Sequence, residues 1–175
     1  MARSLLIALV LLLAVPAAGA PPEKATFAGG CFWCMEPPFE KLPGVISVVS
    51  GYTGETGIEA VEVVYDPARV TYPRLLEVFW RNVDPTNPRG QFCDAGPRYR
   101  SAIFFHDEGQ RRAAVASRDA LAQQKNWRIV TEIRPAATFH RAEEGHQDYY
   151  RRNPIRYRFY RFNCGRDLRL RQLWR

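Results

Sequence analysis

Two cysteines, Cys31 and Cys34, stand three positions apart in the stretch GGCFWCME, residues 29–36. Unpaired backbone N–H groups and the positive end of the helix dipole stabilise a thiolate at the start of a helix, where we expect Cys31 to lie. A cysteine one turn later is within disulfide reach of the first after a small adjustment. The spacing therefore predicts a reactive thiol pair with Cys31 as the nucleophile.

The residues around Cys31 indicate the kind of substrate that such a thiol would meet. Gly29 and Gly30 leave backbone N–H groups free near the sulfur, which suits a substrate that carries oxygen. Phe32 and Trp33 offer an aromatic wall, which suits a methyl group or a thioether. Packing of the helix against the core is the competing interpretation of these two aromatic residues.

The remaining cysteines, Cys93 and Cys164, are far apart, and neither has a close cysteine partner. Structural zinc sites use four ligands, usually in two close pairs, and none of the three histidines is spaced to complete such a pair. A static disulfide between Cys31 and Cys34 would stabilise little, because its loop is short. We therefore expect no metal site and predict redox chemistry, either of a thiol–disulfide carrier or of a nucleophile with a resolving thiol.

The elements that must position these residues alternate between strand and helix patterns. Strands are predicted at residues 24–30, 43–54, 58–66, 100–106 and 128–136, and helices at 31–42, 71–83, 107–124 and 141–153. The order β-α-β-β-α-β, followed by α-β and a tail, predicts a single α+β domain, a two-layer sandwich with a ferredoxin-like (split βαβ) core. We expect functional residues in the turn-rich loop at 84–99.

The first 20 residues are typical of a secretory signal peptide, with a short positive start, the apolar run LLIALVLLLAV and small residues before Pro21. An uncleaved membrane anchor is the alternative. We expect a mature domain at residues 24–155 that is exported, either periplasmic or secreted, and that lies off the membrane after cleavage. Structural disulfides are allowed in such a compartment.

A basic, aromatic tail follows at residues 156–175 and carries Cys164. From residue 151 onward, nine arginines stand against one acid, Asp167, in a chain of net charge +7. Arginines interleaved with aromatic residues are typical of nucleic-acid contacts, and an anionic membrane surface is a weaker third interpretation. Because export argues against nucleic acid, we interpret the segment as a solvated tail that its aromatic residues pack over the domain.

The blocks GCFWCMEPPF, LPGVISVVSGYTG, EAVEVVYDP, YRSAIFF and HQDYYRRNP occur in this order. Over most of residues 25–155 they resemble the A-type peptide methionine sulfoxide reductases. The resemblance implies that family's α+β sandwich and the activity of a peptide-methionine (S)-S-oxide reductase, which reduces methionine-S-sulfoxide, in proteins or free, to methionine. It also implies electrons from a thioredoxin-like dithiol and no bound cofactor, and we expect a monomer.

The same resemblance assigns roles residue by residue. Cys31 attacks the sulfoxide sulfur and becomes a sulfenic acid, and Glu59, rather than Glu62, protonates the sulfoxide oxygen. The implied substrate-binding residues are Phe32 and Trp33, which hold the methyl group, and Asp94 and Tyr99, which bind the substrate amide and oxygen. The competing interpretations are an outward-facing strand acid for Glu59 and a turn residue for Asp94.

The identity of the resolving thiol is open at this point. Cys34 is nearest, and Cys164 lies about where many family members carry a tail cysteine. Either one, or both in relay, can form the disulfide with Cys31 that the outside dithiol then reduces. The resemblance gives Cys93 no role.

The chain departs from the family pattern in one place. GYTGETGIEAV omits a segment whose N-P-x-Y tyrosine helps to bind the sulfoxide oxygen in the family, and Tyr52 is the candidate to replace it. The omission keeps two other functions open. These are a thiol–disulfide carrier that uses only Cys31 and Cys34, and a basic binding module without catalysis.

Overall fold

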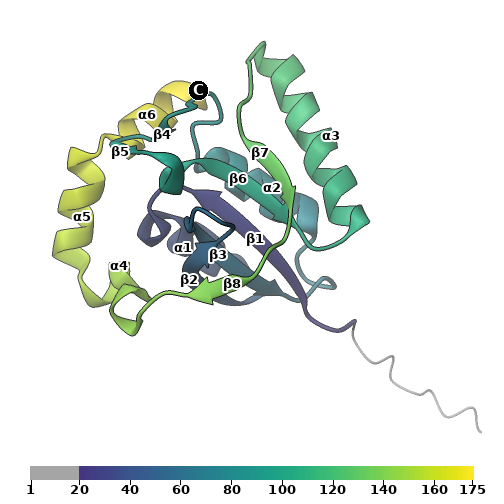
Figure 1. Ribbon diagram of the computed structural model, residues 1–175, viewed down its shortest axis with the longest axis horizontal. Coiled ribbons are helices and arrows are strands. Elements are labelled where there is room, and N and C mark those ends of the chain that lie inside the picture. Colours follow the sequence, from purple (N-terminus) through teal and green to yellow (C-terminus); the bar gives the residue numbers. More distant parts are fainter. Residues whose placement is uncertain (1–19) are drawn as a thin grey trace, which may run out of the picture.

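A six-stranded sheet runs through the centre of the protein in the computed structural model, which describes residues 20–175 (Figure 1). Its strands are β1 (Glu23–Gly29), β2 (Val45–Thr53), β3 (Ile58–Tyr65), β6 (Ser101–Phe105), β7 (Glu132–Pro135) and β8 (Phe139–Arg141). The strand order is β7-β6-β1-β3-β2-β8, and all neighbours are antiparallel except β6 and β7. Residues 1–19 of the predicted signal peptide lie outside the described residues.

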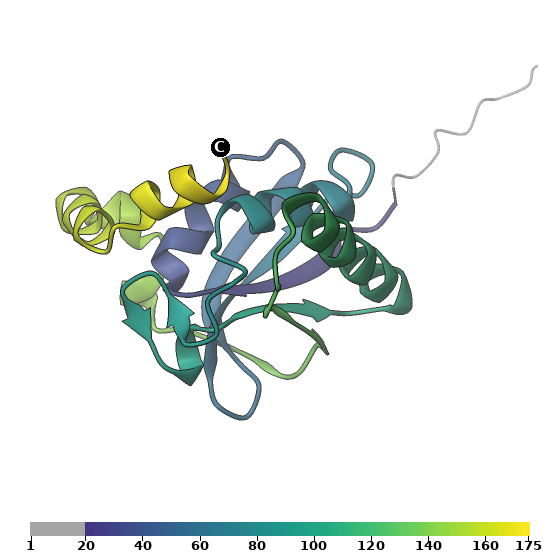
Figure 2. The same ribbon diagram turned by 90° about the horizontal axis from the view of Figure 1, so that it is seen from above.

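Three helices, α1 (Phe32–Glu40), α2 (Tyr72–Arg81) and α3 (Glu108–Lys125), lie on the same side of this sheet (Figure 2). Phe27 of β1 is the centre of the core on that side. Its ring stacks on Phe39 of α1 and Phe79 of α2, with centroids 5.0 and 5.3 Å away. Burial of each such side chain contributes about 1.5–3 kcal/mol. The other face is covered by the connection between β7 and β8, through Ala136 and Phe139.

The helix starts follow the capping residues in the sequence. The Thr71 side chain accepts a hydrogen bond from the Arg74 N–H at the start of α2, and the Asp107 side chain accepts one from the Gln110 N–H at the start of α3. The predicted strands and helices up to residue 124 form within a few residues of their expected limits. The prediction of a single α+β domain is confirmed. Among residues 20–175, no helix is long and apolar enough to cross a membrane.

Two glycines, Gly29 and Gly30, connect β1 to α1 where neighbouring side chains leave no room for a Cβ atom. A Cβ atom at Gly29 would lie 2.6 Å from Sδ of Met35, and one at Gly30 would lie 2.6 Å from Cβ of Gln91. Gly30 also has a φ of +79°, which side chains disfavour. This close passage places Cys31 directly at the N-terminus of α1.

The C-terminal segment differs from the prediction. Instead of one helix at 141–153, it contains a 3₁₀ turn (Glu144–His146) and the short helix α4 (Tyr149–Arg152). The tail forms two further helices, α5 (Pro154–Asn163) and α6 (Arg166–Leu173), and β8 also escaped prediction. These elements are short and rich in arginine, so they lack the apolar periodicity by which a helix or strand is recognised.

The tail packs on the domain through Tyr160, one of the aromatic residues expected to do so, but not through Phe159 or Phe162. Phe159 and Phe162 share one face of α5 and are 69% and 82% exposed. The anchor is Arg166, which is 1% exposed and donates hydrogen bonds to the carbonyl oxygens of Gly29 and Asn82 at 3.1 and 2.7 Å. The prediction that aromatic residues pack the tail is therefore wrong for Phe159 and Phe162, because they lie opposite the face of α5 that meets the domain.

Candidate active site

Cys31 and Cys34 form a buried pair at the start of α1. Cys31 is the residue that precedes the helix, and the Cys34 N–H donates to its carbonyl oxygen at 3.0 Å. Both are free thiols, 7% and 1% exposed. The helix turn thus brings the two sulfurs together, as the spacing predicts.

The two thiols have opposite shifts in pKa. The pKa of Cys34 is lowered to about 6, first because Cys31 donates a hydrogen bond to its sulfur and then because of the positive charges of Arg166 and Arg161. The pKa of Cys31 is raised well above its usual range because its proton is held by Cys34 and the site is buried. The helix N-terminus led us to expect the charge on Cys31, whereas the hydrogen bond from Cys31 and the positive charges of Arg166 and Arg161 favour it on Cys34.

The aromatic wall beside the thiols has one buried and one half-buried member. Phe32 belongs to the core and faces the ring of Tyr52 at 5.6 Å. Trp33 stacks on Tyr149 at 3.8 Å, and its indole N–H donates to Nδ1 of His146 at 3.2 Å. Core packing is therefore confirmed for Phe32, and a substrate wall made of Phe32 and Trp33 stays a prediction.

Glu59 of β3 is the acid nearest to the start of α1. Its Oε2 accepts a hydrogen bond from the Phe32 N–H at 3.2 Å. Burial raises the pKa of Glu59 to about 7, and the charge of Asp94 adds to the rise. Glu62, three positions later on the strand, instead pairs with Lys24 at 3.0 Å. The alternation of the strand separates the two acids, and only Glu59 lies beside the thiol pair.

Asp94 and Tyr99 approach from the loop at 84–99, which contains the small hairpin β4 (Gly90–Gln91) and β5 (Asp94–Ala95). Tyr99 ends a 3₁₀ turn (Pro97–Tyr99). Burial raises the pKa of the Tyr99 hydroxyl, and the charges of Glu59, Asp94 and Cys31 act in the same direction. The loop therefore brings Asp94 and Tyr99 close enough to Glu59 for their charges to interact, and Tyr99 close enough to Cys31.

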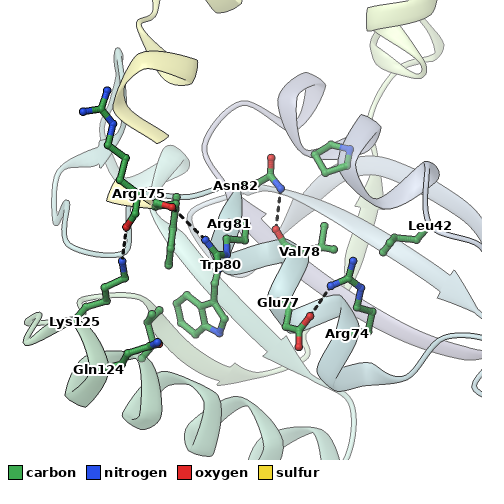
Figure 3. A pocket seen from close by; sticks show the side chains of 13 residues that line it. Leu42, Arg74, Glu77, Val78, Trp80, Arg81, Asn82, Gln124, Lys125 and Arg175 are labelled. Carbon is green, nitrogen blue, oxygen red and sulfur yellow. Dashed lines mark hydrogen bonds and ion pairs between the residues drawn. The ribbon is translucent and has the colours of Figure 1, made fainter. Parts of the chain in front are cut away.

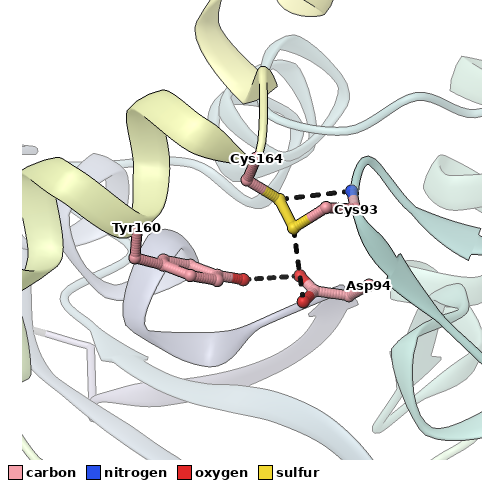
Figure 4. Close-up of a disulfide and its surroundings, with 4 residues drawn as sticks. All are labelled: Cys93, Asp94, Tyr160 and Cys164. Atoms are coloured by element: carbon pink, nitrogen blue, oxygen red, sulfur yellow. Dashed lines mark hydrogen bonds between the residues drawn. A yellow bond between two sulfur atoms is a disulfide. The ribbon is translucent and has the colours of Figure 1, made fainter.

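Cys93 and Cys164 form a disulfide, with their Cα atoms 4.9 Å apart (Figure 4). This bond ties α5 to the loop immediately before Asp94. Sequence reasoning offered Cys164 as a resolving thiol and gave Cys93 no role. In this arrangement Cys164 is bonded to Cys93, and Cys34 is the free thiol beside Cys31.

Tyr52, the candidate to replace the omitted tyrosine, lies on β2 beside Glu59. It is the direct partner of Glu59 in the pairing of β2 with β3. Burial raises the pKa of its hydroxyl, followed by the charges of Glu143 and Glu59, and Arg98 lies over its ring at 5.2 Å. Its role at the sulfoxide oxygen stays a prediction.

A thiol pair, a protonatable acid and an aromatic wall are thus assembled on one site. The family model for peptide methionine sulfoxide reductase matches residues 23–175, which include this site and the whole C-terminal segment. The chain belongs to the peptide methionine sulfoxide reductase family.

Similar proteins agree with this assignment. The chain is 49% identical over 182 residues to peptide methionine sulfoxide reductase MsrA 2 of Caulobacter vibrioides, which covers 94% of this chain and 92% of that protein. Reduced Mxr1 from Saccharomyces cerevisiae has a TM-score of 0.73 at 27% identity, over 77% of this chain and 87% of that one. Mxr1 solved in complex with Trx2 has a TM-score of 0.59 at 27% identity, over 79% and 90%. The resemblance drawn from the sequence blocks is confirmed.

Several residues that shape this reductase site escaped sequence reasoning. His146 and Tyr149 belong to the HQDYYRRNP block, which was recognised without a role for either. Arg161 and Arg166 lie in the segment that the sequence predicts to be a solvated tail, yet they stabilise charge on Cys34. Tyr160 is one of the aromatic residues of that segment, and nothing in the sequence distinguishes it from the others.

A hollow of about 820 Å³ lies elsewhere, between α2, α3 and the C-terminus (Figure 3). Lys125 closes one side and donates hydrogen bonds to the carbonyl oxygens of Leu173 and Arg175. None of the thiol-site residues lines it. The contacts of Lys125 hold the C-terminal residues in place, and we assign no chemistry to the hollow.

The charge on the thiol pair predicts a measurable titration. Thiolate absorbance in the ultraviolet should rise with a midpoint near pH 6, because the pKa of Cys34 is lowered to about 6. Arg161→Met should move the midpoint upward, because it removes a positive charge beside that sulfur. Arg158→Met, on the exposed side of the same helix, should leave it unchanged. A wild-type midpoint in the ordinary range of cysteine would contradict the assignment.

Proposed function

We infer that this chain reduces methionine sulfoxide to methionine, with Cys31 as the nucleophile. The observation that carries the inference is the position of Glu59, a buried acid with a pKa of about 7. It accepts a hydrogen bond from the N–H of Phe32, the residue that follows Cys31. Exchange between a thiol and a disulfide breaks no sulfur–oxygen bond and so has no oxygen to protonate. A sulfoxide needs such an acid, because its oxygen must be protonated before the sulfur is attacked.

In the first step, the proton on Cys31 passes to Cys34, and the Cys31 thiolate attacks the sulfoxide sulfur. Glu59 gives its proton to the oxygen, the sulfur–oxygen bond of the substrate breaks, and that oxygen ends on Cys31. Two electrons pass from the Cys31 sulfur to the substrate sulfur. The products are methionine and a sulfenic acid on Cys31. Phe32 and Trp33 face the apolar methyl group during this step.

In the second step, Cys34 attacks the sulfenic sulfur of Cys31, and water leaves as the disulfide forms. We assign this role to Cys34 because it is free and lies one turn away, whereas Cys164 is bonded to Cys93. An outside dithiol then reduces the new disulfide and becomes oxidised itself. The solved complex of yeast Mxr1 with Trx2 supports a thioredoxin-like donor for this step. These steps draw their electrons from thiols and need no bound cofactor.

Several finer assignments belong to the same proposal. The substrate is the S epimer, as the family resemblance implies, in proteins or free. The chain acts as an exported monomer, periplasmic or secreted, that lies off the membrane once residues 1–20 are removed. The apolar start of the chain and the Cys93–Cys164 disulfide support export, since such bonds persist in oxidising compartments. The core is of the ferredoxin-like type, which the strand order β6-β1-β3-β2 supports.

The activity is tested with the separated S and R epimers of a blocked methionine sulfoxide. The chain from residue 24, with dithiothreitol as reductant, should convert the S epimer alone, and methionine is measured by chromatography. Cys31→Ser should abolish the conversion, because no other thiol starts the reaction. Failure of the wild-type chain with both epimers would overturn the proposed function.

Glu59 predicts the pH dependence of that rate. The active form is the protonated acid, so the rate should fall as pH rises through about 7, where Glu59 loses its proton. Glu59→Gln should lower kcat by about 10²–10⁴-fold and remove this decline, because an amide does not titrate. Exchange of the thiol pair with a small aromatic disulfide should be unaffected. Unchanged sulfoxide reduction in the variant would exclude Glu59 as the acid.

The resolving thiol is tested with a thioredoxin, its reductase and NADPH as the electron source. Cys34→Ser should release about one equivalent of methionine and then stop with a sulfenic acid on Cys31, which dimedone traps for mass spectrometry. Continued turnover in this variant, with a Cys31–Cys164 disulfide found by peptide mapping, would assign the role to Cys164 instead.

A further inference from the structure

Tyr160 of α5 points into the active site, while its neighbours Phe159 and Phe162 point away from it. Its hydroxyl donates a hydrogen bond to Oδ2 of Asp94 at 2.6 Å (Figure 4). The edge of its ring packs on Trp33, with centroids 5.9 Å apart and planes at 82°. The tail therefore contributes a phenol to the same space that Trp33 and Asp94 border.

The Tyr160 hydroxyl also lies beside the nucleophile. A side-chain interaction with this hydroxyl lowers the pKa of Cys31 against the larger effects that raise it. Burial, and after it the charge of Cys31, raise the pKa of Tyr160, so this phenol keeps its proton. A neutral phenol thus stands beside the Cys31 sulfur.

The Cys93–Cys164 disulfide holds both ends of the Tyr160–Asp94 contact. Cys164 follows Tyr160 by one helical turn, and its N–H donates to the Tyr160 carbonyl oxygen at 2.9 Å. Cys93 directly precedes Asp94. The donor on α5 and the acceptor on the loop are therefore joined by a covalent bond, although they are 66 positions apart in the sequence. Such a link preorganises the phenol before substrate enters.

We propose that Tyr160 is a further catalytic residue, whose hydroxyl donates a hydrogen bond to the sulfoxide oxygen while Cys31 attacks, and that the Cys93–Cys164 disulfide positions it. The inference rests on the proposed function. When substrate binds, its amide N–H engages Asp94, and the Tyr160 hydroxyl turns from Asp94 to the sulfoxide oxygen. The phenol proton stays on Tyr160, and Glu59 supplies the proton that is transferred.

Tyr160→Phe tests this role, because it keeps the ring against Trp33 and removes only the hydroxyl. In a single turnover without added reductant, the rate of methionine formation from the blocked S epimer should fall by about 10²-fold, as for the loss of one oxyanion donor. KM should stay within about twofold, because the hydrogen bond strengthens only during attack. The matched control is Tyr150→Phe in α4, which removes a contact between the phenol and the carboxylate of Glu40 in α1. This variant should retain the wild-type rate.

A role exercised only through Asp94 would give a different result. Dimethyl sulfoxide has no amide for Asp94 to bind, so Tyr160→Phe should slow its reduction as much as that of the blocked epimer. A rise in KM with an unchanged rate of attack, or a loss limited to the amide substrate, would overturn the proposal. No conversion by the wild-type chain would instead be the failure of the proposed function.

The disulfide is tested with the double variant Cys93→Ser/Cys164→Ser, which retains Cys31 and Cys34. Its single-turnover rate should fall, and adding Tyr160→Phe should lower it little further, because the two changes remove the same contact. Since one turnover requires no resolving thiol, this result is independent of which cysteine resolves the sulfenic acid. Full additivity of the two changes would show that the disulfide does not position Tyr160.

Discussion

A negative charge on a buried sulfur is the constraint on which this site depends. Burial disfavours a thiolate, so the charge on Cys34 persists only where donors and positive charges replace water. Cys31 supplies the donor, and Arg161 and Arg166 supply the charge. Both arginines come from the C-terminal segment, which must therefore be fixed on the domain for the thiol pair to be reactive. The buried contacts of Arg166 with Gly29 and Asn82 achieve this at the strand end that leads to Cys31.

The same burial has the opposite consequence for Glu59. With only the Phe32 N–H and Arg98 to oppose it, desolvation keeps this acid partly protonated near neutral pH. One enclosed site thus holds a thiol that ionises readily and an acid that retains its proton. In the proposed reaction the charge moves from Cys34 to Cys31 as Cys31 attacks, while Glu59 gives its proton to the oxygen, and environments that separate pKa values are how a protein provides both groups.

The C-terminal tail is consequently packed against the thiol pair rather than being an appendage. Its inward face carries Tyr160, Arg161 and the cysteine that bonds to Cys93, and its outward face carries Phe159 and Phe162. The two cysteine pairs are in different states. Cys31 and Cys34 are free to change oxidation state, while Cys93 and Cys164 hold the tail over them.

Local features could be predicted from the sequence, namely the thiol pair at a helix N-terminus and the order of strands and helices to residue 124. These depend on neighbours a few positions apart, which leave periodic and capping signals. The family blocks implied the choice of Glu59 over Glu62 and the roles of Phe32, Trp33, Asp94 and Tyr99. The position of the tail could be read only from the folded chain. The Cys93–Cys164 bond spans 71 positions, and the contact of Arg166 with Gly29 spans 137. Arginines and tyrosines on a short helix look alike whether they face solvent or a sulfur, because no local pattern encodes a partner so distant along the chain.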